Sequence, residues 1–149
     1  VGVRVTNVGS DMGSVTPMLY QLERRTGQLP ATLMADANHA KHECIRVCDA
    51  RGVEALISVP ARSQQAGANA DQDLAVVAWR ERMGTAAAQT IYKERAATAE
   101  CVNALARNRG LRQFLVRGRP KVNAVLLWFA LAHNLMRSVA LRATAAAPA

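Results

Sequence analysis

Hydrophobic and polar positions in the first sixty residues follow two different periods, which predicts strands and helices in alternation. Segments with alternating or short continuous apolar runs and many β-branched residues predict strands. Segments with apolar residues three and four apart predict amphipathic helices, the first of which we expect to end at Gly27. The predicted order is a strand at 1–8, a helix at 14–27, a strand at 30–36, a helix at 38–52 and a strand at 53–60. This order favours an α/β layer with a short, mostly parallel sheet.

The pattern changes after residue 60, where a polar loop leads into a helical half. The apolar run "AVLLWFALA" at 124–132 is too short to span a bilayer, so we interpret it as part of a core helix and expect no membrane partner. We expect one domain at 1–142 and a disordered tail at 143–149. The predicted elements of this half are helices at 73–83 and 86–107, a basic segment rich in turns at 108–120 and an apolar closing helix at 121–137.

Charge is distributed unevenly along these elements, although the chain as a whole carries +8. Residues 1–92 hold nine basic and nine acidic side chains, whereas residues 93–121 hold eight basic and two acidic ones. Arg137 and Arg142 supply the rest of the excess. A focused basic segment is the electrostatic footprint expected for binding a phosphate backbone, while a plain solvated surface is the alternative.

Two carboxylates are candidates for chemistry. Asp36 lies at the end of a predicted strand, where the working residues of open α/β sheets lie, although it could equally cap the next helix. Glu100 lies in an alanine-rich helix beside Arg107, and it could equally form a surface ion pair. Helical periodicity predicts that Glu100 points away from the core face of this helix, which we assign to Ile91, Thr98, Val102 and Leu105.

The helix around Glu100 also carries a spaced pattern, Y-x2-R-x4-E-x6-R, formed by Tyr92, Arg95, Glu100 and Arg107. This pattern resembles the Y-R-E-K signature of DDE transposases from bacterial insertion sequences. The segments that lead to Asp36 and that follow Glu100 are similar to the corresponding segments of that family. The resemblance therefore covers nearly all of residues 4–137.

The resemblance implies a partial ribonuclease H-like domain that acts in DNA transposition by metal-dependent strand cleavage and transfer. Asp36 and Glu100 would be the second Asp and the Glu of the catalytic triad and would bind Mg²⁺ or Mn²⁺. The family's first Asp would lie upstream of this chain, so we expect no catalysis by the chain alone. The implied setting is a bacterial cytoplasm, with transposon-end and target DNA as partners and a homodimer in the full-length assembly. The residues implied to contact DNA are Tyr92, Arg95, Arg107, Arg109 and Arg112.

Other classes of function compete with this interpretation. A non-catalytic basic module that binds nucleic acid would explain the charge but would leave Asp36 and the spaced pattern to chance. A poorly folded gene remnant is a third alternative. Zinc binding is a weak fourth, because the four potential ligands at 39–48 lie in one predicted helix, whereas structural zinc sites usually join separate elements. We interpret its cysteines, Cys44 and Cys48, as reduced core thiols.

Overall fold

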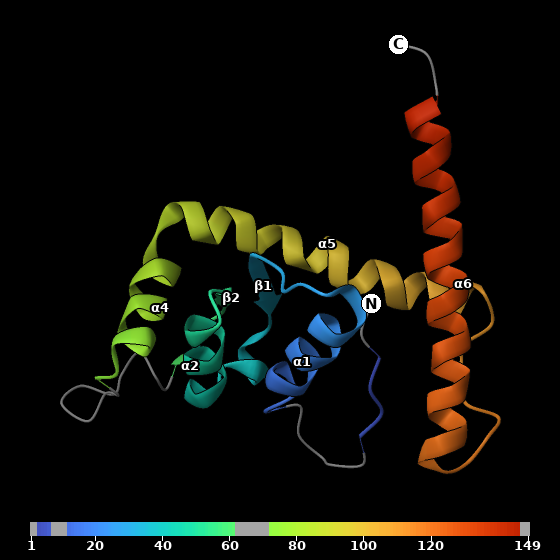
Figure 1. Ribbon diagram of the computed structural model, residues 1–149, viewed down its shortest axis with the longest axis horizontal. Helices are drawn as coiled ribbons and strands as arrows, with labels where there is room; N and C mark the ends of the chain where they lie inside the picture. The colour runs from blue at the N-terminus through green and yellow to red at the C-terminus, as the bar shows by residue number, and fades with distance from the viewer. Residues whose placement is uncertain (1–2, 7–11, 62–71, 147–149) are drawn as a thin grey trace. The chain divides into compact units, whose positions relative to one another are not determined.

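The computed structural model describes residues 3–6, 12–61 and 72–146, without the side chains of 98–100 and 146. Figure 1 shows its elements. The chain forms two compact units, which we treat separately. Val8–Ala97 is the α/β unit, and Thr98–Ala149 together with Val1–Asn7 is the helical unit. The expected single domain at 1–142 therefore consists of two such units.

The elements of the α/β unit match the predicted order from the second element onward. Helix α1 ends where we predicted, at Gly27, whose φ of 75° suits glycine and whose N–H donates to the Glu23 carbonyl at 2.8 Å. The helix predicted at 38–52 is instead a 3-10 turn followed by a shorter α-helix. The elements are α1 (Val15–Thr26), β1 (Thr32–Ala35), η1 (Ala37–His39), α2 (His42–Ala50), β2 (Glu54–Ile57), α4 (Leu74–Gly84) and the first half of α5 (Ala86–Asn108).

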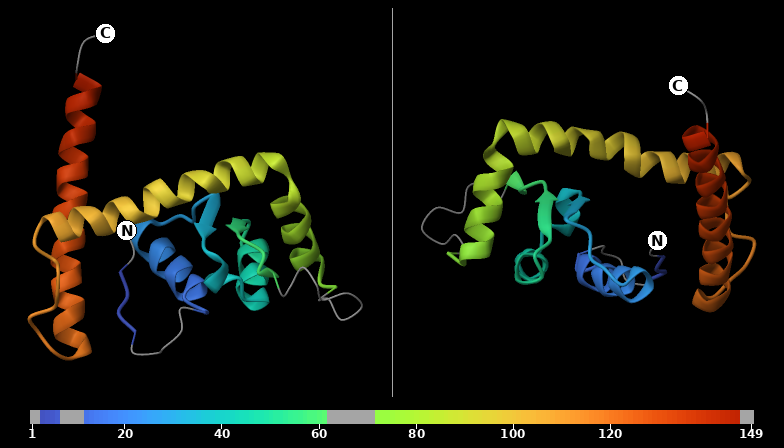
Figure 2. Two further views of the ribbon diagram at one scale, coloured as in Figure 1. Left: turned by 180° about the vertical axis from the view of Figure 1, so that it is seen from behind. Right: turned by 45° about the horizontal axis from the view of Figure 1, so that its top comes forward.

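The two strands pair in parallel, as predicted, with Thr32 opposite Glu54 and Ala35 opposite Ile57. Figure 2 shows the strands side by side, with α2 and α4 next to β2. Parallel pairing directs the carboxyl ends of both strands to the same edge. The structure thus confirms a mostly helical α/β chain with a short parallel sheet.

The core of the α/β unit lies between the sheet and helices α1, α2 and α4. Trp79 is fully buried, and its indole N–H donates to the Ile57 carbonyl at 2.9 Å. Both Cys44 and Cys48 are buried free thiols, which confirms their predicted place in the core. The sheet is therefore covered by apolar side chains that the helical periodicity had placed inward.

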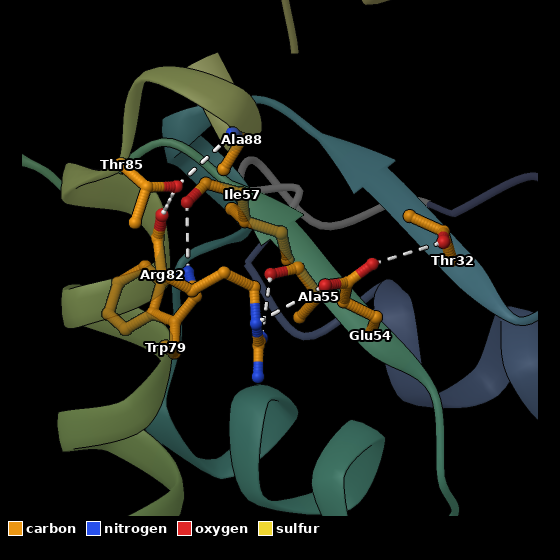
Figure 3. A network of polar contacts seen from close by, with 8 residues as sticks. All are labelled: Thr32, Glu54, Ala55, Ile57, Trp79, Arg82, Thr85 and Ala88. Atoms are coloured by element: carbon orange, nitrogen blue, oxygen red, sulfur yellow. Dashed lines mark hydrogen bonds and ion pairs between the residues drawn. The ribbon is translucent and has the colours of Figure 1, made fainter. Parts of the chain in front are cut away.

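Polar contacts fix α4 to the edge of β2 and determine where α5 begins (Figure 3). Arg82 lies 3.4 Å from a carboxylate oxygen of Glu54 and also donates to the Ala55 carbonyl at 3.5 Å. The Thr85 hydroxyl donates to the Arg82 carbonyl at 2.7 Å and accepts from the N–H of Ala88 at 3.2 Å. Thr85 thus closes α4 and caps α5.

The helical unit contains the end of α5 and helix α6 (Arg119–Ala146). Helix α6 is longer than predicted and includes residues 143–146, which we had expected in a disordered tail; residues 147–149 lie outside the described part. By length and composition alone, Arg119–Ala145 could cross a membrane, with a mean hydropathy of 1.5. The sequence-based exclusion of a membrane span considered only the nine-residue apolar run at 124–132, which is much shorter than the helix that contains it.

Three further predictions about burial and strands are wrong. Residues 3–6, the described part of the predicted first strand, form no strand. The face of α5 assigned to the core is exposed at Ile91 and Val102, both 47% exposed, whereas Ala88 is buried and Tyr92 packs against the core. None of the described side chains of α6 is buried, so this helix is not a core helix of the chain.

Candidate functional site

Asp36 is the first residue after β1, at the carboxyl end of the strand as predicted. Its carboxylate also caps the following 3-10 turn, because Oδ1 accepts the N–H of Asn38 at 3.0 Å. The side chain of Asp36 is 44% exposed, and His39 Nε2 lies 3.9 Å from Oδ1. Among the described residues, Asp36 Oδ2 has no hydrogen-bond partner. The capping role that we weighed against a functional one is therefore real, but it occupies only one of the two oxygens.

Tyr92 connects helix α5 to the same end of β1. Its hydroxyl donates to the carbonyl of Ala35, the residue directly before Asp36, at 3.1 Å. The Arg95 guanidinium carbon lies 5.4 Å from the centre of the Tyr92 ring, within the range of a cation–π contact. The first residue of the spaced pattern is therefore bonded to the strand end that carries Asp36, and the second lies over the ring of the first.

Arg95 is half-buried, and its Nε is a buried donor without a hydrogen-bond partner among the described atoms. Such a donor is costly unless an acceptor is available to it. An arginine stacked on a tyrosine with one donor unsatisfied has the chemistry to receive an anionic oxygen.

The remaining residues of the pattern belong to the helical unit. The structure gives Glu100 a place in α5 but leaves its side chain outside the described part, so its predicted proximity to Asp36 stays a prediction. Arg107, Arg109 and Arg112 are exposed, and no described side chain forms an ion pair with them.

No three histidine, cysteine, aspartate or glutamate side chains come together as a metal-binding group anywhere in the described part. The potential zinc ligands at 39–48 separate between η1 and α2. Burial, with a smaller contribution from Cys44, raises the pKa of the Cys48 thiol to about 11. A raised pKa favours the protonated thiol, whereas the thiolate is the form that binds metal. Cys48 is therefore a core residue here and not a zinc ligand.

The sequence did not single out one further group, an apolar pocket in the helical unit with polar residues at its margin. Its α6 residues recur three and four apart, at Leu126, Phe129, Ala130, His133 and Arg137, so they share a helix face. This spacing is visible in the sequence and could have indicated the shared helix face.

The structure thus defines an α/β protein with a carboxylate at a strand end, a signature helix bonded to that end, and a separate basic helical unit. A family model described as transposase DDE domain matches residues 39–139. The match covers more than half of the chain, so the protein belongs to the transposase DDE domain family. It includes Tyr92, Arg95, Glu100 and Arg107, and it begins three residues after Asp36. No curated protein and no solved structure matches the chain.

Family membership confirms the resemblance that the spaced pattern indicated. At the level of the family, the chain is a part of the transposition machinery and DNA is the implied partner. DDE transposases use divalent metal ions, and the oxygen ligands that such ions prefer are of the kind that Asp36 offers.

Proposed function

We propose that this chain contributes Asp36 and Glu100 to the metal site of a transposase with a ribonuclease H-like catalytic domain. The site would serve DNA strand cleavage and transfer at the ends of an insertion sequence. Exposed arginines of the helical unit would hold the DNA backbone.

The observation that carries the proposal is the hydrogen bond from Tyr92 to the Ala35 carbonyl. It aligns one face of α5 with the strand end that bears Asp36. Helical geometry turns about 100° per residue, so Glu100, eight residues after Tyr92, lies about 80° from it around the axis. We therefore expect Glu100 on the same half of the α5 circumference as Tyr92, about 12 Å further along the axis.

The donor type of the proposed site fits a hard divalent cation. Asp36 keeps one carboxylate oxygen without a partner among the described residues, and it is accessible to solvent. Bound Mg²⁺ would supply charge stabilisation for the phosphate and a more acidic water. The chain's own residues would have simpler tasks. Asp36 and Glu100 would bind the cation, and Tyr92 would fix the strand end.

A second candidate function is a non-catalytic module that binds nucleic acid by its backbone alone. The observation in its favour is that the whole excess charge lies in one unit. The helical unit contains nine basic residues and one acidic residue, whereas the α/β unit contains ten of each. Such a module needs neither Asp36 nor Glu100.

Paramagnetic Mn²⁺ distinguishes the two candidates. In NMR spectra of the full chain, Mn²⁺ should broaden the amide signals next to Asp36 and those next to Glu100 over the same range of concentration, because one ion would lie near both. Asp36→Asn should weaken the response at both places by about tenfold or more, since a ligand charge is lost. Glu100→Gln should do the same.

Glu94→Gln is the matched control, because Glu94 lies on the same helix outside the spaced pattern. It should leave both responses unchanged. If Asp36→Asn abolishes broadening near residue 36 but leaves it intact near residue 100, the two carboxylates do not share an ion. DNA binding without any Mn²⁺ response at either carboxylate would favour the non-catalytic module.

A further inference from the structure

The helical unit contains a pocket of about 390 Å³ between the end of α5, the segment that follows it and the middle of α6. Most of the residues that line it are apolar, among them Leu111, Leu126 and Phe129. This volume lies within the range of small-molecule and cofactor sites, which are mostly apolar with a few polar groups. The pocket is formed entirely within one compact unit, so its shape depends on that unit alone.

The polar groups at the pocket margin are of two kinds. Asn103, Asn134 and His133 offer both hydrogen-bond donors and acceptors. Arg109 and Arg137 are permanently cationic. Among the described side chains that line the pocket, none is a carboxylate. The combination selects a ligand that has an apolar surface, edges with donors and acceptors, and an attached negative charge.

We propose that this pocket binds the base of an unpaired nucleotide, with Arg109 and Arg137 holding the adjacent phosphate. A nucleobase supplies a flat face for Phe129 and polar edges for the amides and the imidazole. In an intact duplex these faces are stacked, so only an unpaired base can enter. The inference rests on the proposed DNA binding and adds to it a preference for single-stranded segments.

An acyl chain with a carboxylate head is the competing occupant. It would use the apolar residues and one arginine, but its hydrocarbon part has neither donors nor acceptors, and its carboxylate can only accept hydrogen bonds. Asn103, Asn134 and His133, which together offer donors and acceptors, are therefore the reason for choosing a nucleotide.

The test compares three short DNA probes at one salt concentration by fluorescence anisotropy. They are a mixed-sequence single strand, its duplex and the same single strand with abasic sites, which keep the phosphates but lack bases. The full chain should bind the single strand about tenfold more tightly than the abasic strand, because base stacking on an aromatic ring contributes an effect of this size. The duplex should lack this advantage.

Two matched pairs of variants locate the effect. Phe129→Ala should remove the difference between the normal and abasic strands, whereas Trp128→Ala should keep it, because Trp128 lies outside this pocket and is 71% exposed. Arg109→Gln should reduce affinity for the normal strand more than Arg112→Gln does, although both remove one charge. Far-UV circular dichroism checks that each variant keeps its helices, and Arg109, an exposed residue, still tests the pocket if Phe129→Ala unfolds.

Each outcome decides between the alternatives. The proposed role of the pocket would be overturned if both members of each pair lost the same affinity for the normal strand. Equal affinity of the full chain for the normal and abasic strands would overturn it as well. Either result would leave general DNA binding in place. Displacement by decanoate but not by a nucleoside monophosphate would assign the pocket to an acyl chain. Failure to bind any of the three probes at low salt would count against the proposed DNA binding itself.

Discussion

The two units of this chain differ in how they use apolar and charged residues. All fourteen residues that are buried in the described part of the chain belong to the α/β unit, whose charges balance. Many of those charges are paired, as in the ion pairs Arg51–Glu23 at 2.6 Å and Arg46–Asp73 at 3.0 Å. The helical unit buries none of its described residues, and it carries the whole excess of +8. One unit is therefore stabilised by its own core, whereas the other presents to its surroundings apolar side chains and cations that pair with no described carboxylate.

The difference indicates a division of tasks. The α/β unit holds the strand end with Asp36 in a fixed framework, in which Trp79 and Arg82 secure α4 to β2. The helical unit supplies positive charge that DNA phosphates would neutralise. We expect the stability of the first to be insensitive to DNA and that of the second to rise on binding, since a ligand that binds only the folded form stabilises it.

The largest effect should come from truncating the one tryptophan of the α/β core. Trp79→Ala removes a fully buried ring and its hydrogen bond to the Ile57 carbonyl, so the free energy of unfolding should fall by about 3–5 kcal/mol. Trp128→Ala, in the helical unit, should change it by less than about 0.5 kcal/mol, because that ring is 71% exposed. Urea denaturation followed by circular dichroism measures both. A similar decrease in the free energy of unfolding in both variants would contradict the inference that only the α/β unit is stabilised by a core of its own.

The second effect concerns DNA affinity. Replacing Arg107, Arg109 and Arg112 by Ala should reduce the slope of log affinity against log salt by about 2 to 3, since each phosphate contact contributes about 0.9. Replacing Arg24 and Arg25 of the neutral α/β unit is the control and should leave the slope unchanged. Measurement is by anisotropy with duplex DNA between roughly 50 and 200 mM salt. An equal reduction by the control would mean that binding follows total charge and not the helical unit.

The sequence predicted the elements whose signals are local. Gly27 ends α1 as predicted, and helices α1, α4 and α5 lie within one or two residues of their predicted bounds. The structure adds that Asp73 caps α4 and Thr85 caps α5, both through contacts with neighbouring residues. The parallel pairing of the two strands followed from the helix between them. Such features depend on neighbouring residues, so one segment of sequence contains enough information to predict them.

Features that depend on distant partners were not predictable in this way. Alternation at residues 1–8 indicated a strand, but a strand needs a neighbour with which to pair, and the described part, residues 3–6, forms none. Hydrophobicity assigned Ile91 to the core face of α5, whereas the contact of Tyr92 with β1 turns Ala88 and Tyr92 inward. The partner of that contact lies fifty-seven residues away in the sequence.

For the candidate site, the sequence located Asp36 at a strand end and Tyr92 and Arg95 in the signature. The structure bonds Tyr92 to that strand and places Arg95 over the Tyr92 ring. The sequence also offered the capping role of Asp36, and the structure shows the carboxylate in that role at η1. The pocket in the helical unit was missed because its lining comes from separate segments, and only the α6 row has a regular spacing.

The smallest effect compares the two tyrosines of the chain, each of which has an arginine over its ring. Arg95 lies over Tyr92 and Arg51 lies over Tyr20, with the guanidinium carbon 4.6 Å from the ring centre in the second pair. Only the Tyr92 hydroxyl forms a described hydrogen bond, to the Ala35 carbonyl. Tyr92→Phe keeps the ring but loses this bond, so the free energy of unfolding should fall by about 1 kcal/mol. Tyr20→Phe should change it by less than about 0.5 kcal/mol.

A change in stability alone would not separate a structural role of Tyr92 from a role in positioning Asp36. The amide signals of residues 35–38 supply the second measurement. Tyr92→Phe should speed their hydrogen exchange and weaken their response to Mn²⁺, because the strand end loses the contact that fixes it to α5. Tyr20→Phe should alter neither. If Tyr92→Phe lowers stability while exchange and Mn²⁺ response at residues 35–38 stay unchanged, the hydroxyl stabilises the α/β unit without positioning Asp36.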